Sequence, residues 1–264
     1  MKLLTLNVHA WQEENQLDKI YTLAKAINEK EYDVIALQEV SQHRESPIHQ
    51  GSVRSDNYAL LLQQALASLG NNNYELEWVM SHYGYEVYEE GLALLTKLPV
   101  DEYHQFYITS STSIDFWKSR NIVGATMHIE DKDIAVYSCH LGWWDDLDES
   151  YEKQVDTLLQ HVSPATYTFL MGDFNAASST NYQGYDYILS KGVKDTHSIA
   201  ATQTGQSTVE GKIAGWDSNQ GGVKIDYIFS LTNVNVTSSS IIFNGTHYPI
   251  LSDHYGVEVE VTLN

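Results

Sequence analysis

The chain has 264 residues, a hydrophobic fraction of 42% and a formal net charge of −20. This length and composition are typical of a globular protein with a large core and exclude a disordered chain. The negative charge repels the phosphate backbone of nucleic acids at long range, which is unfavourable for a general nuclease.

The N-terminal segment predicts a cytoplasmic protein. Residues 1–16 lack the apolar stretch and the small-residue cleavage site of a signal peptide, and no apolar run reaches the roughly 20 residues of a membrane helix. Cys139 is the one cysteine, which excludes an internal disulfide and a thiolate zinc cluster. No linker divides the chain, so a single domain over residues 1–264 is predicted, with no indication of its oligomeric state.

The first half of the chain alternates apolar strands with amphipathic helices. Apolar runs predict strands near residues 2–7, 33–40, 74–83, 91–99 and 121–129. Apolar residues at helical spacing predict helices over residues 15–32 and 57–70. Asn15 is the expected N-cap of the first helix, and Gly70 is expected to end the second.

The second half has the same plan. Strands are predicted near residues 133–141, 167–175, 223–230 and 255–263, and helices over residues 150–162 and 185–193. Each half therefore contains a strand, a helix and a buried strand that ends in polar residues. This order predicts two stacked sheets with helices outside them.

The segment TFLMGDFNAASS, residues 168–179, ends a buried strand on two polar residues. Asp173 and Asn175 flank Phe174, and a strand period of two puts the polar pair on one face and Phe174 toward the core. Gly172 is expected to let the backbone pass close to a neighbour. A buried strand holds such a carboxylate in a fixed position.

Similar polar residues follow the other apolar runs: Asn7, Gln38, Glu39, His140, Asp226, Asp253 and His254. Polar side chains at the ends of packed strands converge on one rim of a sandwich. Oxygen ligands of this kind suit Mg²⁺, which needs only one or two carboxylates because it keeps several waters. His254 is suited to acid–base chemistry near neutral pH, with Asp226 orienting its ring.

The segments LLTLNV, DVIALQEV, VYSCHL, MGDFN, KIDYIF and LSDHYGV occur in this order from residue 3 to residue 257. In this series the chain resembles the endonuclease/exonuclease/phosphatase superfamily, which has a deoxyribonuclease I-like fold. The resemblance implies an α/β protein built as a four-layer α/β/β/α sandwich, with two mixed sheets inside and the site between them.

The resemblance also implies a role for each motif residue. Glu39 resembles the main Mg²⁺ ligand, with Asn7 beside it and Asp253 as a partly water-mediated contact. The resemblance allows Mn²⁺ in place of Mg²⁺. It leaves open whether the site holds one metal ion or two. Catalytic roles are implied for five further residues: Asp173 for the attacking water, Asn175 for a phosphate oxygen, His140 for transition-state charge, and Asp226 with His254 as an orienting pair. Asp173 and His254 remain rival candidates for the general base.

The substrate is not implied by the fold, because the superfamily includes nucleases, sphingomyelinases and sugar-phosphate phosphatases. The charge disfavours nucleic acid, and the absent export signal disfavours a secreted sphingomyelinase. Trp143 and Trp144 follow His140 in a loop and are candidates to stack on a sugar ring. Arg54 and Arg120 are candidate phosphate-binding cations near the motif segments.

Further segments, including YDVIALQEVSQ and GKIAGW, resemble the maltose 6′-phosphate phosphatases. This resemblance implies a Mg²⁺-dependent phosphatase that hydrolyses a small phosphorylated sugar by in-line water attack. Phosphodiesterase, nuclease or sphingomyelinase-like activity at the same site is the alternative. A catalytically silent sugar-binding protein is a more remote alternative, because the sequence retains every metal-binding and nucleophile position of the family motifs.

Overall fold

The structure, a computed structural model, describes residues 1–178, 183–246 and 248–263. Its helices are α1 (Gln16–Lys30), α2 (Tyr58–Ser68), α3 (Tyr151–His161), α4 (Gln183–Ser190) and α5 (Thr196–Ile199). None of the helices in these ranges combines the length and apolar character that crossing a bilayer requires.

Two mixed sheets form the centre of the molecule. The order of the larger sheet is β12 (Thr202–Thr204), β16 (Asn235–Ile242), β17 (Gly256–Thr262), β1 (Lys2–Asn7), β2 (Val34–His43), β6 (Tyr88–Thr96) and β5 (Glu75–Gly84). The order of the smaller sheet is β11 (Lys194–Asp195), β15 (Asp226–Ser230), β10 (Tyr167–Asp173), β9 (Lys132–His140), β8 (Asn121–Ile129) and β7 (Glu102–Tyr107). Separate short pairs are β3 (Ile48–Gln50) with β4 (Val53–Arg54), and β13 (Val209–Glu210) with β14 (Gly222–Val223).

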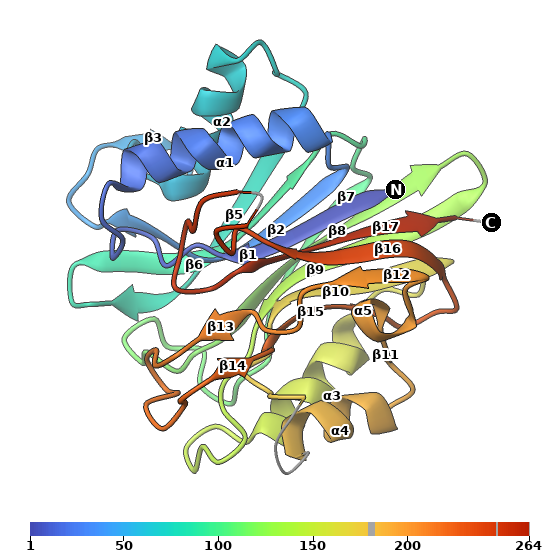
Figure 1. Cartoon of the computed structure of the whole chain (residues 1–264). Helices are drawn as coiled ribbons and strands as arrows, with labels where there is room; N and C mark the ends of the chain where they lie inside the picture. The colour runs from blue at the N-terminus through green and yellow to red at the C-terminus, as the bar shows by residue number, and fades with distance from the viewer. Residues whose placement is uncertain (179–182, 247, 264) are drawn as a thin grey trace.

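The helices cover the outer faces of the two sheets, as Figure 1 shows. Helices α1 and α2 lie on the larger sheet, and α3 and α4 lie on the smaller one. One apolar core lies under α1 and α2, and a second fills the space between the sheets and continues under α3 and α4. The four-layer sandwich expected from the sequence is confirmed.

Strand β1 shows how the sequence directs a residue to the space between the sheets. Leu4 and Leu6 pack in the core under the helices, whereas Leu3 packs between the sheets. Because side chains alternate along a strand, Asn7 shares the inner face with Leu3. In the neighbouring β2, the Gln38 side chain likewise crosses to the other sheet, where its Nε2 donates to the Ser138 hydroxyl over 3.0 Å.

Some local expectations were wrong or incomplete. Asn15 precedes α1, but its backbone is left-handed and its side chain makes no capping hydrogen bond. An N-cap side chain normally reaches the first-turn N–H groups from an extended backbone, which Asn15 does not have. Gly70 does follow the end of α2 with a positive φ. The sequence patterns missed β7 and β16, because β16 carries three consecutive serines in place of an apolar run.

Candidate active site

Side chains from both sheets meet around Asn7. The Asn7 amide donates to Glu39 Oε1 over 2.8 Å and to Asp173 Oδ2 over 3.2 Å. Its Oδ1 accepts from the His9 N–H over 3.1 Å, which fixes the orientation of the amide. Asn7 therefore links a carboxylate of the larger sheet to a carboxylate of the smaller sheet.

Glu39 reaches this position through a β-bulge. Simple alternation along β2 would turn Glu39 toward the helices, because Ile35 and Leu37 pack there. However, Val40 takes the next place in that core. The register between β2 and β6 shifts between Leu37 and Val40, and Glu39 has a φ of +53°. A bulge with a left-handed residue re-aims a side chain and costs free energy, and it is common next to active sites.

Asp173 is anchored by the backbone around it. At Gly172, any Cβ atom would lie 1.8 Å from the Cys139 carbonyl oxygen, so only glycine allows β10 to approach β9 this closely. Phe174 is 1% exposed and packs in the core, as expected. Asp173 Oδ1 accepts from the Asn175 N–H over 2.9 Å, which ties the carboxylate to the turn that follows the strand.

Two histidines face Asp173. His140 Nε2 lies 3.6 Å and His254 Nε2 lies 3.8 Å from Asp173 Oδ2. On its other side, His254 Nδ1 donates to Asp226 over 2.9 Å, which fixes the ring. The predicted orienting role of Asp226 therefore has the geometry that it requires.

Burial shifts the pKa of each of these groups. Burial and the Asp226 carboxylate raise the pKa of Asp173 to about 7. Burial disfavours the charged form of His254, but the Asp226 and Asp173 carboxylates outweigh it and raise its pKa to about 10. For His140, burial and the nearby cations lower the pKa well below its usual range.

Asn175 lies beside Asp173 for a reason that differs from the expected one. Strand β10 ends at Asp173, and Asn175 has a φ of +46°, so strand alternation does not place it. Its Nδ2 donates to the Leu141 carbonyl over 3.0 Å, and its Oδ1 accepts from Trp216 Nε1 over 3.0 Å. Because an indole N–H can only donate, Trp216 holds Oδ1 and leaves one amide N–H of Asn175 for a ligand.

Replacing Trp216 with phenylalanine is expected to lower kcat about tenfold, because the Asn175 amide then loses one fixed partner and can rotate. The measurement is steady-state kinetics of the single variant and of the same change in an Asn175→Ala background. In that background we expect no further loss. Equal losses in both backgrounds would show that Trp216 acts independently of Asn175.

A cavity of about 270 Å³ opens beside these residues. Its wall includes Glu39, His140, Asp173, Asn175 and His254, together with Trp117, Arg120 and Trp143 from loops. The side chain of Arg120 is buried, yet its guanidinium donates no hydrogen bond to any residue of the described ranges. Trp143 lines the cavity at a ring-centroid distance of 6.0 Å from Trp117.

The other substrate-binding candidates lie elsewhere. Trp144 packs against Tyr151 and Tyr187 and lines a neighbouring cavity, not the one at Asp173. Arg54 donates to both carboxylate oxygens of Glu89, over 2.7 and 2.8 Å, and to a backbone carbonyl. The structure therefore does not bring Arg54 to the site, because its guanidinium is already paired within its own hairpin and β6.

Replacing Arg54 with methionine is therefore expected to leave kcat/KM within about twofold and to lower Tm by about 2–4 °C, or roughly 1 kcal/mol. Arg54 holds the pKa of Glu89 below its usual range. A carboxylate whose pKa is lowered by folding stabilises the folded state when the pH is above the ordinary pKa of the group. This stabilisation is lost as the pH falls through the lowered pKa. The Tm difference should shrink in acid, and thermal scans between neutral and acidic pH would measure it.

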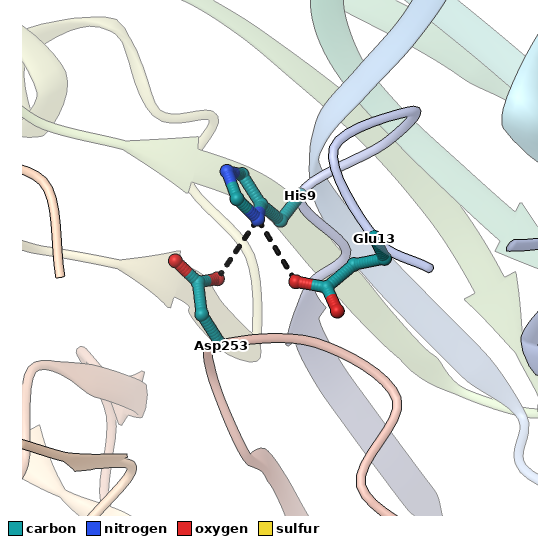
Figure 2. Close-up of side chains that lie close together, drawn as sticks. All are labelled: His9, Glu13 and Asp253. Carbon is teal, nitrogen blue, oxygen red and sulfur yellow. Dashed lines mark hydrogen bonds and ion pairs between the residues drawn. The ribbon is translucent and has the colours of Figure 1, made fainter. Parts of the chain in front are cut away.

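Asp253 is held by a different group. Figure 2 shows His9 between Glu13 and Asp253, with His9 Nδ1 2.9 Å from Glu13 Oε1 and 3.5 Å from Asp253 Oδ1. The Ser252 hydroxyl also donates to Asp253 Oδ1, over 3.2 Å. The Asp253 carboxylate therefore does not join the group formed by Glu39, His140 and Asp173.

The donor set at the centre fits a hard divalent cation. Ligand atoms of Glu39, His140 and Asp173 all lie within 4.8 Å of one another. Burial raises the pKa of both Glu39 and Asp173, and the neighbouring Glu90 and Asp226 carboxylates add to the respective shifts. A cation with oxygen preference would remove this cost, as Mg²⁺ does in carboxylate sites.

A sequence model of the Endonuclease/Exonuclease/phosphatase family matches residues 4–254, a range that includes every motif residue from Asn7 to His254. The chain belongs to this family. No curated protein sequence matches the chain significantly. Members of the family are metal-dependent hydrolases of phosphoester bonds, and the chain is accordingly a phosphoester hydrolase.

Solved structures agree with this assignment. An endonuclease/exonuclease/phosphatase family protein from Leptotrichia buccalis is 40% identical, with a TM-score of 0.94 over 100% of both chains. A mannosyl-6-phosphatase from Bacteroides thetaiotaomicron is 15% identical, with a TM-score of 0.70 over 100% of both chains. A mutant beta toxin from Staphylococcus aureus with bound magnesium ions is 16% identical, with a TM-score of 0.70 over 99% of both chains. The last two share the fold.

Proposed function

We propose that the protein is a Mg²⁺-dependent phosphatase that hydrolyses a small sugar phosphate, such as maltose 6′-phosphate. The observation that carries this proposal is the buried guanidinium of Arg120, which lacks a hydrogen-bond partner in the described ranges and lines the same cavity as Asp173. A planar guanidinium is suited to bind a phosphate group through paired hydrogen bonds.

The size and walls of the cavity support a small substrate. Its volume of about 270 Å³ lies near the lower end of the range for small-molecule sites. The faces of Trp117 and Trp143 supply apolar surface of the kind on which sugar rings stack. A net charge of −20 disfavours nucleic acid but does not prevent the binding of a small anion beside a cation.

The residues around Asp173 have matched roles in this reaction. The Asp173 carboxylate would orient and deprotonate a water molecule in line with the leaving oxygen. The free amide N–H of Asn175, the ring N–H groups of His140 and His254, and Arg120 would donate to the phosphate oxygens as negative charge develops. Asp226 would keep the His254 ring in place.

Glu39 and the Asn7 amide would hold the metal ion, with Asp253 contributing through water. When bound, Mg²⁺ supplies Lewis-acid polarisation of the phosphate ester. For this to occur, the Asn7 amide would rotate so that Oδ1 faces the ion, which breaks its present contact with the His9 N–H. The fold of the mannosyl-6-phosphatase shows that this architecture supports hydrolysis of a sugar phosphate in another protein.

The test is phosphate release from maltose 6′-phosphate, mannose 6-phosphate, a phosphodiester reporter and plasmid DNA, each with Mg²⁺ and with EDTA. We expect EDTA-sensitive release from a sugar phosphate and little cleavage of DNA. Cleavage of DNA or of the diester in preference to the monoesters would overturn the proposal in favour of a nuclease or phosphodiesterase. Saturable sugar binding without phosphate release would indicate a binding protein.

A further inference from the structure

Two further polar side chains line the cavity that contains Asp173, and the proposed catalytic chemistry uses neither of them. His82 lies on β5 and Glu90 lies on the adjacent β6. Their side chains are 5% and 11% exposed, and both border the cavity.

The hydrogen bond of His82 determines which ring nitrogen carries the proton. Nδ1 lies 3.2 Å from the Tyr83 carbonyl oxygen, which can only accept, so Nδ1 is the donor. Burial and Arg120 lower the pKa of His82 to about 4, which leaves the ring neutral near pH 7. In this form Nε2 is an acceptor, and it has no hydrogen-bond partner within the described ranges.

The Glu90 carboxylate, a second acceptor, lies close to this nitrogen. Glu90 Oε1 lies 3.4 Å from His82 Nε2, and no residue in the described part of the chain donates to the Glu90 carboxylate. A buried acceptor such as His82 Nε2 is costly without a donor, and burial raises the pKa of the Glu90 carboxyl beside it. A ligand that offers two donors at this spacing would satisfy both.

We infer that His82 and Glu90 form a subsite for two neighbouring hydroxyl groups of the sugar ring of the substrate. Adjacent hydroxyls on a ring can each donate one hydrogen bond, and they lie at a spacing similar to that of the two acceptors. In this arrangement the phosphate would lie at Asp173 and the Asn175 amide, and the neutral part of the substrate would lie at His82 and Glu90. This inference deepens the proposed function and rests on it.

The variants His82→Leu and Glu90→Gln test the subsite. Both variants approximately keep the volume of the side chain. His82→Leu removes the Nε2 acceptor, and Glu90→Gln removes the negative charge of the carboxylate. We expect kcat/KM for maltose 6′-phosphate or mannose 6-phosphate to fall about 10- to 100-fold, because a buried hydrogen bond to a substrate hydroxyl is lost. Hydrolysis of p-nitrophenyl phosphate, which has no ring hydroxyls, should fall by less than about threefold.

His104→Leu is the matched control. His104 lies on β7, contacts Thr126 and does not line the cavity, so its replacement should change the hydrolysis of neither substrate. Equal losses on the sugar phosphate and on p-nitrophenyl phosphate would overturn the inference, because they would show general damage or a direct role in catalysis. Unchanged kinetics of both variants on the sugar phosphate would overturn it as well.

A second measurement separates this inference from the proposed function. Free maltose and mannose should inhibit wild-type hydrolysis of p-nitrophenyl phosphate, and the inhibition constant should rise at least about tenfold in both variants. If no sugar phosphate is hydrolysed but this inhibition and its loss are observed, the proposed function fails and the subsite stands. If sugar phosphates are hydrolysed but the inhibition is equal in wild type and variants, the subsite fails alone.

Discussion

Asp173→Asn is expected to lower kcat by about 1,000-fold or more while leaving the fold intact. The amide keeps the size of the carboxylate and one oxygen acceptor, which can serve the Asn175 N–H, but it gives up the second acceptor that Asn7 uses and cannot take a proton from water. Since Asp173 is 2% exposed and anchored at Gly172, no neighbouring group can move into its place without backbone displacement. Single-turnover phosphate release with excess Mg²⁺ would measure the loss.

Asp156→Asn is the control for this variant. Asp156 lies on α3 and pairs with Lys191 at the surface, so its replacement should leave kcat unchanged. Thermal unfolding of both variants would show whether the fold is retained. A folded Asp173→Asn protein with wild-type kcat would contradict the role of Asp173 and would transfer the role of general base to another residue, with His254 as the rival.

Glu39→Gln is expected to raise the Mg²⁺ concentration for half-maximal activity by about 100-fold or more, because a charged ligand is lost. EDTA should abolish the activity of the wild type, and added Mg²⁺ should restore it. Activity measured across a Mg²⁺ titration would separate weaker metal binding from a lower kcat at saturation. Unfolding temperatures with and without Mg²⁺ give a second readout, since a ligand that binds only the folded state raises Tm.

Glu77→Gln is the matched control, because Glu77 is also a half-buried strand glutamate but does not line the cavity at Asp173. Its Mg²⁺ dependence should equal that of the wild type. If Glu39→Gln shows the same Mg²⁺ dependence as the wild type in both assays, Glu39 is not a metal ligand. Two groups would then remain as candidates in the described ranges, one formed by Asp173, Asp226 and His254 and the other by His9, Glu13 and Asp253.

Sequence patterns predicted the layers of the fold, and the strand-end polar residues were predicted to converge at one rim. Side-chain period is a local property, and it was sufficient to place Phe174 in the core. The order of the motifs then indicated that Asp173, Asp226 and His254 would meet, although they lie far apart in the sequence. The contacts among these three residues agree with that prediction.

The tertiary structure decided the features that depend on irregular backbone or on partners distant in the sequence. A β-bulge turns Glu39 inward against the strand period. Asn175 lies beside Asp173 because its own backbone is left-handed, and not because of the strand alternation that the sequence predicted. Glu89 pairs with the guanidinium of Arg54. The guanidinium of Arg120 instead lies over the Trp143 ring and has no ion-pair partner among the residues that the structure describes. The pairing of strands that are distant in the sequence decides which arginine has an ion-pair partner. It also decides that His82 faces Glu90, and no local sequence pattern encodes this pairing.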